Sequence, residues 1–351
     1  MNITYAASKK TKPDFSKLGF GKYFTDYMLV ADYKAGVWGE PQIIPYSNFS
    51  LNPTTSVLHY GQGIFEGLKA YKNKSGKIAV FRARDNFLRM NRSAERLCMP
   101  PLDVDKILNG LFALLKLESD WIPSDPGTSL YIRPTMIATD EALGVHPADN
   151  FKFFIILSPV GSYYAGGLKP TKIMIEEHYV RAAVGGTGEI KCMGNYAASL
   201  YASKIANQKG YEQVLWLDGK EHKFVEEVGA MNMFFVIDGI VKTPALTGSI
   251  LPGITRDSVI KLLKSEGIPV EETKISIDEV EVAFKEGRLS EAFGSGTAAV
   301  ISPVGILGYK GADLVLNNNE MGKISSFLYE RLTGIQYGTV ADPFAWRIEV
   351  N

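Results

Sequence analysis

Two Asp-Gly dipeptides, each flanked by short apolar runs, constrain the second half of this 351-residue chain more than any other feature. Asp218-Gly219 and Asp238-Gly239 suit the left-handed backbone of tight two-residue hairpin turns. The strands expected on either side are 214–217 with 222–228, and 233–237 with 240–243. The second half therefore contains antiparallel β structure, and the helical patterns scattered through it predict a mixed α/β (α+β) fold rather than a repeated βαβ winding.

Apolar residues recur every three to four positions in six segments, which predicts amphipathic helices. These segments are 85–98, 104–117, 196–209, 255–266, 277–286 and 320–333. Ser276 and Glu279 have the spacing of a capping box at the start of one helix. The glycines expected to end helices are Gly210, Gly267, Gly287 and Gly334.

The first half ends at a break in periodicity. Residues 78–81, 129–137 and 151–160 are expected strands, and the next seven residues contain three glycines. We therefore expect a smaller N-terminal α/β domain at 1–160, an interdomain loop at 161–168 and a larger C-terminal domain at 169–351. Tyr163 and Tyr164 in the loop form either a packed aromatic turn or a ligand-contacting loop.

Charge and composition exclude several classes of function. Lys plus Arg and Asp plus Glu both number 38, so no basic field would attract nucleic acid or anionic lipid. The longest apolar runs fall far short of the ~20 residues of a membrane span. Two cysteines and four scattered histidines favour neither a disulfide framework nor a metal site. A cytoplasmic protein with small-molecule partners, no nucleic acid, no membrane and no metal is expected.

Lys191 stands out because glycines surround it in GGTGEIKCMGNY. Missing side chains would let a planar ligand approach the backbone closely. A desolvated lysine has a lowered pKa, and its free amine can attack a carbonyl to form a Schiff base and then carry protons. From the glycines alone, a solvated surface lysine is the alternative.

Glu226 and Glu227 follow each other in a β-rich run, so strand alternation predicts that one of them points inward. We expect Glu227 to be the inward residue, on the face of Val225, Gly229 and Met231. Its partner is either a protonated ring nitrogen of a cofactor or an internal Lys or Arg.

Two short segments could bind an anion. Residues 251–256, LPGITR, open an expected helix whose first N–H groups would cradle a phosphate, although Thr255 could equally be an ordinary N-cap. The turn 294–298, GSGTA, follows an expected strand and could present further N–H groups.

Taken together these residues resemble the branched-chain-amino-acid aminotransferases, pyridoxal-phosphate enzymes of fold type IV in the class IV aminotransferase family. The resemblance runs nearly end to end. The segments that carry it are FTDYML, LHYGQGIFEGLKAY, NFLRMNRSAERLCMP, LYIRP, GGTGEIKCMGNYAASL, EQVLWLDG, EEVGAMN, LPGITRDS, EAFGSGTA and IQYG. It implies two domains, the second with barrel-like antiparallel or mixed sheets, and pyridoxal 5'-phosphate (PLP) as the cofactor.

The resemblance assigns roles to cofactor-binding residues. Lys191 would be the Schiff-base lysine and proton shuttle, Glu227 the partner of the pyridinium nitrogen, and Tyr196 a hydrogen-bond partner of the ring hydroxyl. The residues implied for the phosphate are Arg89, Ile254, Thr255 and Thr297. Family members often have EVGTMN where this chain has Ala230, which removes one hydroxyl near Glu227.

Substrate residues are implied in the same way. The aromatic side-chain pocket would consist of Phe20, Tyr60, Phe65, Tyr131 and Tyr164, which without the resemblance would be taken as core residues. The α-carboxylate would lie near Thr297 and Ala298. Arg133 is the candidate for the second carboxylate of glutamate, with a buried structural ion pair as the alternative. Leu143 and Val145 would come from the other subunit of a homodimer.

The implied reaction is the reversible transfer of the amino group of leucine, isoleucine or valine to 2-oxoglutarate, in a ping-pong cycle through PLP and pyridoxamine phosphate. D-amino-acid aminotransferase and aminodeoxychorismate lyase share the fold and are the alternatives. Mammalian members carry a redox-active Cys-x-x-Cys where this chain has Ala299 and Ser302. Of the two cysteines here, Cys192 neighbours Lys191, and Cys98 is expected on a core helix.

Overall fold

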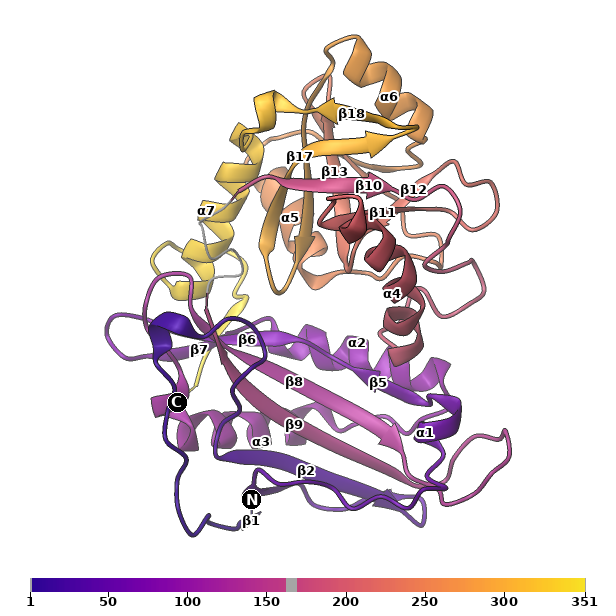
Figure 1. Ribbon diagram of the computed structural model, residues 1–351. Coiled ribbons are helices and arrows are strands. Elements are labelled where there is room, and N and C mark those ends of the chain that lie inside the picture. The colour runs from indigo at the N-terminus through magenta and orange to yellow at the C-terminus, as the bar shows by residue number, and fades with distance from the viewer. Residues whose placement is uncertain (1, 162–168, 351) are drawn as a thin grey trace. The chain divides into compact units, whose positions relative to one another are not determined.

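The computed structural model describes residues 2–161 and 169–350. The chain divides into two compact units (Figure 1). Unit 1 contains residues 1–165, 191–193 and 334–351, and unit 2 contains residues 166–190 and 194–333. The sequence places the second domain at 169–351; the division in the structure differs because two of its segments, 191–193 and 334–351, pack in unit 1.

Unit 1 is built on a ten-stranded sheet in the order β1-β4-β2-β9-β8-β6-β7-β19, with β3 beside β2 and β5 beside β8. Its strands are β1 (Asn2–Ile3), β2 (Tyr27–Lys34), β3 (Val37–Trp38), β4 (Gln42–Pro45), β5 (Gly63–Phe65), β6 (Leu68–Lys72), β7 (Ile78–Phe81), β8 (Ser129–Ala138), β9 (Phe151–Val160) and β19 (Arg347–Glu349). Neighbours are antiparallel except for β1 and β4. The predicted strands at 78–81, 129–137 and 151–160 are confirmed.

Helices α2 (Ala83–Arg96) and α3 (Val104–Leu117) lie along one face of this sheet (Figure 1). The apolar stripe of α2, with Phe87, Met90 and Ala94, has no solvent exposure. Helix α3 begins where the Asp103 carboxylate accepts a hydrogen bond from the Lys106 N–H. A further short helix, α1 (Val57–Tyr60), precedes β5. Both predicted long helices are confirmed, and together they leave the other face of the sheet for a site.

Unit 2 contains a six-stranded closed barrel. Its strands follow the order β12-β11-β10-β17-β16-β13, and β12 also pairs with β13, which closes the ring. They are β10 (Thr171–Ile175), β11 (Gln213–Leu217), β12 (Val225–Val228), β13 (Met231–Ile237), β16 (Leu289–Gly296) and β17 (Val300–Tyr309). β14 (Ile240–Pro244), β15 (Val270–Thr273) and β18 (Ala312–Val315) extend the sheet.

Both Asp-Gly hairpins, β11 with β12 and β13 with β14, are antiparallel as predicted. The first connection is longer than the predicted two residues, and β12 begins only at Val225. The reason is local: the Asp218 carboxylate accepts hydrogen bonds from the backbone N–H groups of residues 220, 221, 223 and 224, which stabilises a wider turn.

Four helices accompany the barrel: α4 (Met193–Gln208), α5 (Ile254–Ser265), α6 (Ile277–Lys285) and α7 (Lys323–Tyr337). The capping box is confirmed in that Ser276 Oγ accepts from the Glu279 N–H at 3.1 Å. The prediction that Gly334 ends a helix is wrong, because α7 continues to Tyr337. Glycine is needed at position 334 because Val340 packs closely against it: a Cβ there would lie 2.9 Å from Val340 Cγ2.

Candidate active site

Lys191 is attached to the edge of the unit 1 sheet. Its carbonyl accepts from the Phe65 N–H at 3.1 Å, and its own N–H donates to Ser93 Oγ at 3.1 Å. The next residue, Cys192, forms an isolated β-bridge with Ile64. The Lys191 ammonium nitrogen lies 5.0 Å from the centre of the Phe65 ring. The backbone is therefore held on both sides of the lysine, and its half-buried side chain lies against an aromatic face.

Three of the predicted substrate residues of unit 1 contact one another beside the Phe65 ring. The Arg133 guanidinium lies 4.6 Å from the centre of the same Phe65 ring, and its Nη2 donates to Tyr131 Oη at 3.1 Å. The Phe20 ring packs edge-on against Tyr131 with centres 4.9 Å apart. Strand alternation explains the grouping of Tyr131 and Arg133, which are two residues apart on β8. The result is an aromatic surface that ends in a cation.

Gly67 makes room for Tyr131. A Cβ at Gly67 would lie 2.1 Å from Tyr131 Oη, so any larger residue would displace the phenol. The glycine in IFEGLK therefore leaves the space that the Tyr131 hydroxyl occupies, and Arg133 Nη2 donates to that hydroxyl.

The remaining predicted substrate residues are more dispersed. Tyr60 on α1 is 43% exposed, and Leu143 and Val145 on the loop before β9 are 67% and 87% exposed. Thr297 and Ala298 are partly buried in the turn between β16 and β17 in unit 2. Tyr164 lies outside the described residues.

Arg89 on α2 is 4% exposed, which excludes the solvated helix arginine as an alternative. Its Nε and Nη2 donate to the two oxygens of Glu66, each at 2.8 Å. Glu66 is itself fully buried. This fork-to-carboxylate pairing fixes the orientation of the guanidinium within unit 1 and compensates its charge.

Both glutamates of β12 are buried, Glu226 at 4% and Glu227 at 3% exposed, so burial does not distinguish them. Successive strand residues point to opposite faces, so both faces of β12 are covered at this position. Glu226 accepts from Ser249 Oγ, and burial raises the pKa of its carboxyl above the ordinary value. Glu227 Oε1 accepts from the Leu251 N–H at 2.7 Å.

Arg181, which the sequence analysis did not single out, is the cation beside Glu227. Its Nε lies 3.2 Å from Glu227 Oε2, and Nη2 donates to the carbonyl oxygens of Gly188 and Ser249. The internal ion pair considered as an alternative partner for Glu227 is therefore present. The ion pair fixes the orientation of the Glu227 carboxylate, the group that would pair with a protonated ring nitrogen.

A small cavity in unit 2 brings together Glu227 and Tyr196. The residues lining it are Arg181, Ile190, Asn195, Tyr196, Ser199, Glu227, Gly229, Ala230 and Leu251. A carboxylate and a phenol facing one cavity suit a pyridine ring that carries a nitrogen and a hydroxyl. The donor set therefore fits PLP.

The α5 N-terminus provides the expected anion cradle. Gly253, not Thr255, is the N-cap, so the N–H groups of Ile254 and Thr255 belong to the first turn. A Cβ at Gly253 would lie 2.0 Å from Asn232 Oδ1. Ser295 pairs with Asn232 across the strands, and its buried hydroxyl has no hydrogen-bond partner among the described residues. This orphaned donor beside a helix N-terminus fits a phosphate.

The glycines before Lys191 serve packing within unit 2. A Cβ at Gly188 would lie 2.2 Å from the Ser249 carbonyl oxygen, and one at Gly186 would lie 3.0 Å from the Ala183 carbonyl oxygen. The expectation that these missing side chains make space for a planar ligand is therefore wrong for Gly188, whose space the protein backbone fills.

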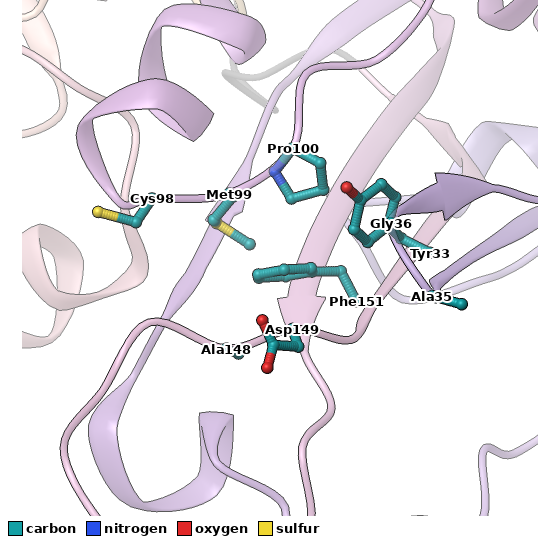
Figure 2. A pocket seen from close by; sticks show the side chains of 9 residues that line it. All are labelled: Tyr33, Ala35, Gly36, Cys98, Met99, Pro100, Ala148, Asp149 and Phe151. Atoms are coloured by element: carbon teal, nitrogen blue, oxygen red, sulfur yellow. The ribbon is translucent and has the colours of Figure 1, made fainter.

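Cys98 does not lie on a core helix. Helix α2 ends at Arg96, and Cys98 is exposed with a left-handed φ of 53°. It borders an open groove of about 570 Å³ in unit 1, and Figure 2 shows its side chain turned away from Phe151. Cys192, in contrast, is 4% exposed.

The described residues contain no cluster of three His, Cys, Asp or Glu side chains arranged for a metal ion. None of the helices in the described ranges combines the length and apolar character needed to cross a membrane.

Comparisons with known proteins agree with this geometry. The family described as Amino-transferase class IV matches residues 63–306. The chain is 55% identical to branched-chain-amino-acid transaminase 1 of Bacillus subtilis (strain 168) over 343 residues, covering 97% of this chain and 96% of that protein.

Solved structures extend the likeness to the fold. The branched-chain amino acid aminotransferase of Escherichia coli superposes with a TM-score of 0.77 at 27% identity, covering 93% of this chain and 99% of that one. The corresponding T.th. enzyme, solved with N-(5'-phosphopyridoxyl)-L-glutamate, gives a TM-score of 0.74 at 25% identity, covering 92% and 98%. The fold is therefore the mixed α/β fold type IV. The chain belongs to the class IV aminotransferases, enzymes whose cofactor is PLP.

Proposed function

We propose that this enzyme is a branched-chain-amino-acid aminotransferase, which moves the amino group of L-leucine, L-isoleucine or L-valine to 2-oxoglutarate and forms L-glutamate. One observation carries the proposal: Lys191 and Arg133 lie on the same Phe65 ring, at 5.0 and 4.6 Å from its centre. An aliphatic side chain packs on the aromatic surface, and the second carboxylate of glutamate pairs with the guanidinium. The relatives named above support the same substrates.

PLP supplies the electron sink for breaking the Cα–H bond. Lys191 would hold the cofactor aldehyde through its amine, and the free amine would then take the proton from the substrate Cα. Glu227, oriented by Arg181, would hold the proton on the ring nitrogen, and Tyr196 would donate to the ring hydroxyl oxygen. These roles are supported by the cavity shared by Tyr196 and Glu227 and by the ion-pair and hydrogen-bond partners of Glu227.

The phosphate is assigned to the first turn of α5, with Ile254 and Thr255, to Thr297 and to Arg89. We add Ser295 to this set because its buried hydroxyl forms no hydrogen bond with the described residues. The substrate pocket is assigned to Phe20, Tyr60, Phe65, Tyr131, Arg133 and Tyr164, with the α-carboxylate near Thr297 and Ala298.

The enzyme is proposed to act as a cytoplasmic homodimer. Leu143 and Val145 are large apolar side chains that are 67% and 87% exposed, and such exposure in a loop favours burial against a partner. A second copy of this chain would receive them at its substrate pocket. Light scattering at micromolar concentration should give a mass twice the 38.6 kDa of one chain. A variant with both Leu143→Asp and Val145→Asp should give the mass of a single chain.

The experiment that tests the function is a product assay. Purified enzyme with leucine and 2-oxoglutarate should yield 4-methyl-2-oxopentanoate and L-glutamate, with a change in the cofactor's absorption when leucine is added alone. D-glutamate from D-amino acids would instead indicate a D-amino-acid aminotransferase. Pyruvate from aminodeoxychorismate would indicate a lyase.

A further inference from the structure

Lys69 shares a face of the unit 1 sheet with the predicted substrate residues. In β6 it stands directly opposite Tyr131 of β8, and Tyr131 stands directly opposite Ser158 of β9. Directly paired residues project from the same face of a sheet, and Arg133 shares that face because it is two residues from Tyr131. Lys69 therefore lies in the same row as the phenol that the Arg133 guanidinium contacts.

Besides Lys69, this face holds three buried side-chain atoms that form no hydrogen bond with the described residues. Lys69 is 8% and Ser158 4% exposed. Arg133 Nε, Ser158 Oγ and Ser129 Oγ are buried and form no hydrogen bond with any residue the structure describes. Buried polar groups are nearly always satisfied in folded proteins, so several orphaned donors on one face indicate a polar ligand group. A nitrogen donor of a guanidinium cannot accept a hydrogen bond, which makes that group an acceptor.

The charge of the face selects a carboxylate. Arg133 is oriented by its bond to Tyr131 Oη, which leaves its Nε donor for the ligand. A carboxylate has about four acceptor positions and is stabilised by charge-assisted bonds from more than one cation. We propose that Lys69 is the second cation, with Arg133, of the subsite that binds the distal carboxylate of 2-oxoglutarate and glutamate. The proposal rests on the function given above and adds a specificity-determining residue to it.

The charge state of Lys69 allows this role near neutral pH. Burial lowers the pKa of its amine to about 8, so the cation predominates below that pH and is lost above it. The titratable and charged groups of the neighbouring strands on this face are Tyr131 and Arg133 on β8 and Tyr71 on β6, with Tyr337 packed on Tyr71. Arginine at position 69 would stay charged throughout.

Three variants of the holoenzyme test the proposal. Lys69→Met should raise KM for 2-oxoglutarate and glutamate at least about 10-fold while KM for leucine stays within about twofold. Lys69→Arg should restore most of the dicarboxylate affinity. Lys72→Met is the matched control: this lysine is on the same strand, projects from the other face and donates to the Ser119 carbonyl oxygen, and its loss should change neither KM.

Two further measurements cover the case in which Lys69→Met folds poorly. In the wild type, KM for 2-oxoglutarate should rise as pH increases through about 8, and Lys69→Arg should remove that rise. Calorimetry with glutarate, a dicarboxylate that cannot react, should show the same loss of affinity above about pH 8 in the wild type and no such loss in Lys69→Arg.

The outcomes separate this proposal from the proposed function. If Arg133→Met weakens dicarboxylates selectively but Lys69→Met weakens neither substrate class or both equally, the role of Lys69 is wrong and the function stands. If no branched-chain amino acid reacts with the wild type, the function itself fails.

Discussion

Arg181 Nε lies 3.2 Å from Glu227 Oε2 in unit 2, and both side chains are almost completely buried. Removing either partner of this ion pair would leave a buried charge uncompensated. The pair also fixes the orientation of the carboxylate, whose Oε1 accepts from the Leu251 N–H.

We predict that Glu227→Gln lowers kcat by at least about 10²-fold while cofactor absorbance is retained, since a neutral amide no longer stabilises the ring proton. The amide oxygen can still accept from the Leu251 N–H, but Arg181 loses its ion-pair partner, so the thermal midpoint should fall while the cofactor stays bound. Glu226→Gln is the matched control on the same strand and should change kcat little. Equal losses in the two variants would contradict the assignment of Glu227.

Lys191→Ala should abolish turnover, with a loss well above the roughly 10²–10⁴-fold of acid–base catalysis alone, because both covalent attachment and proton transfer disappear. The thermal midpoint should stay near the wild-type value, since the backbone contacts to Phe65 and Ser93 do not involve the side chain. Lys204→Ala, an exposed lysine on α4, serves as the control. Residual amino exchange near the wild-type rate would disprove the role.

Arg133→Met should raise KM for glutamate and 2-oxoglutarate at least about 10-fold more than KM for leucine, because only the dicarboxylates lose a charge-assisted bond. Steady-state kinetics with each substrate varied in turn would measure this. A uniform loss would instead favour a structural role through the Tyr131 contact.

Glu118 predicts a pH-dependent stability. Burial raises the pKa of its carboxyl to about 7, although the Tyr27 N–H that donates to it acts the other way. A raised folded-state pKa means that the folded state holds the proton more tightly, so wild-type stability falls as pH rises from about 4.5 to about 7.

Glu118→Gln cannot ionise, and its oxygen can still accept from Tyr27. The free energy of unfolding of the variant, minus that of the wild type, should therefore increase by up to about 3 kcal/mol between pH 5 and pH 8. Urea unfolding at both pH values measures the gain, with exposed Glu95→Gln as the control. A difference that stays constant with pH would contradict the prediction.

Mild peroxide should leave activity nearly unchanged, and dithiothreitol should not raise it. The turn after Thr297 has Ala299 and Ser302 and so offers no thiol pair, and Cys192 is buried. Peroxide should modify exposed Cys98 instead, as mass spectrometry would show. Inactivation that persists in a Cys98→Ser, Cys192→Ala double variant would rule out thiol oxidation as its cause.

Much of the fold could be predicted because local chemistry determines it. The Asp-Gly turns set two hairpins, and the Ser276 capping box set the start of α6, without reference to distant residues. Predictions failed where packing between segments decides the outcome. Gly334 has the pattern of a helix stop, but Val340 packs against it and requires a small residue inside α7.

The residues of the candidate site also divide into those that sequence motifs predicted and those that only the structure revealed. Family motifs located Lys191, Arg133 and Glu227, but no pattern in the sequence pointed to Arg181 or Lys69. Arg181 acquires its role from a contact 46 positions away in the chain, with Glu227. Lys69 acquires its position from strand register with Tyr131. Neither contact leaves a periodic signal within its own segment.

The pairing of β19 with β7 has a consequence for the order in which the protein is completed during synthesis. Unit 1 contains the first strands to leave the ribosome, yet it also needs residues 191–193 and 334–351. Unit 2 is nearly continuous and can close its barrel before the last strand is made. The usual sequence, in which the N-terminal domain finishes first, is therefore reversed. Until residues 347–349 have emerged, β7 lacks its antiparallel partner β19 and presents unpaired N–H and C=O groups along that edge.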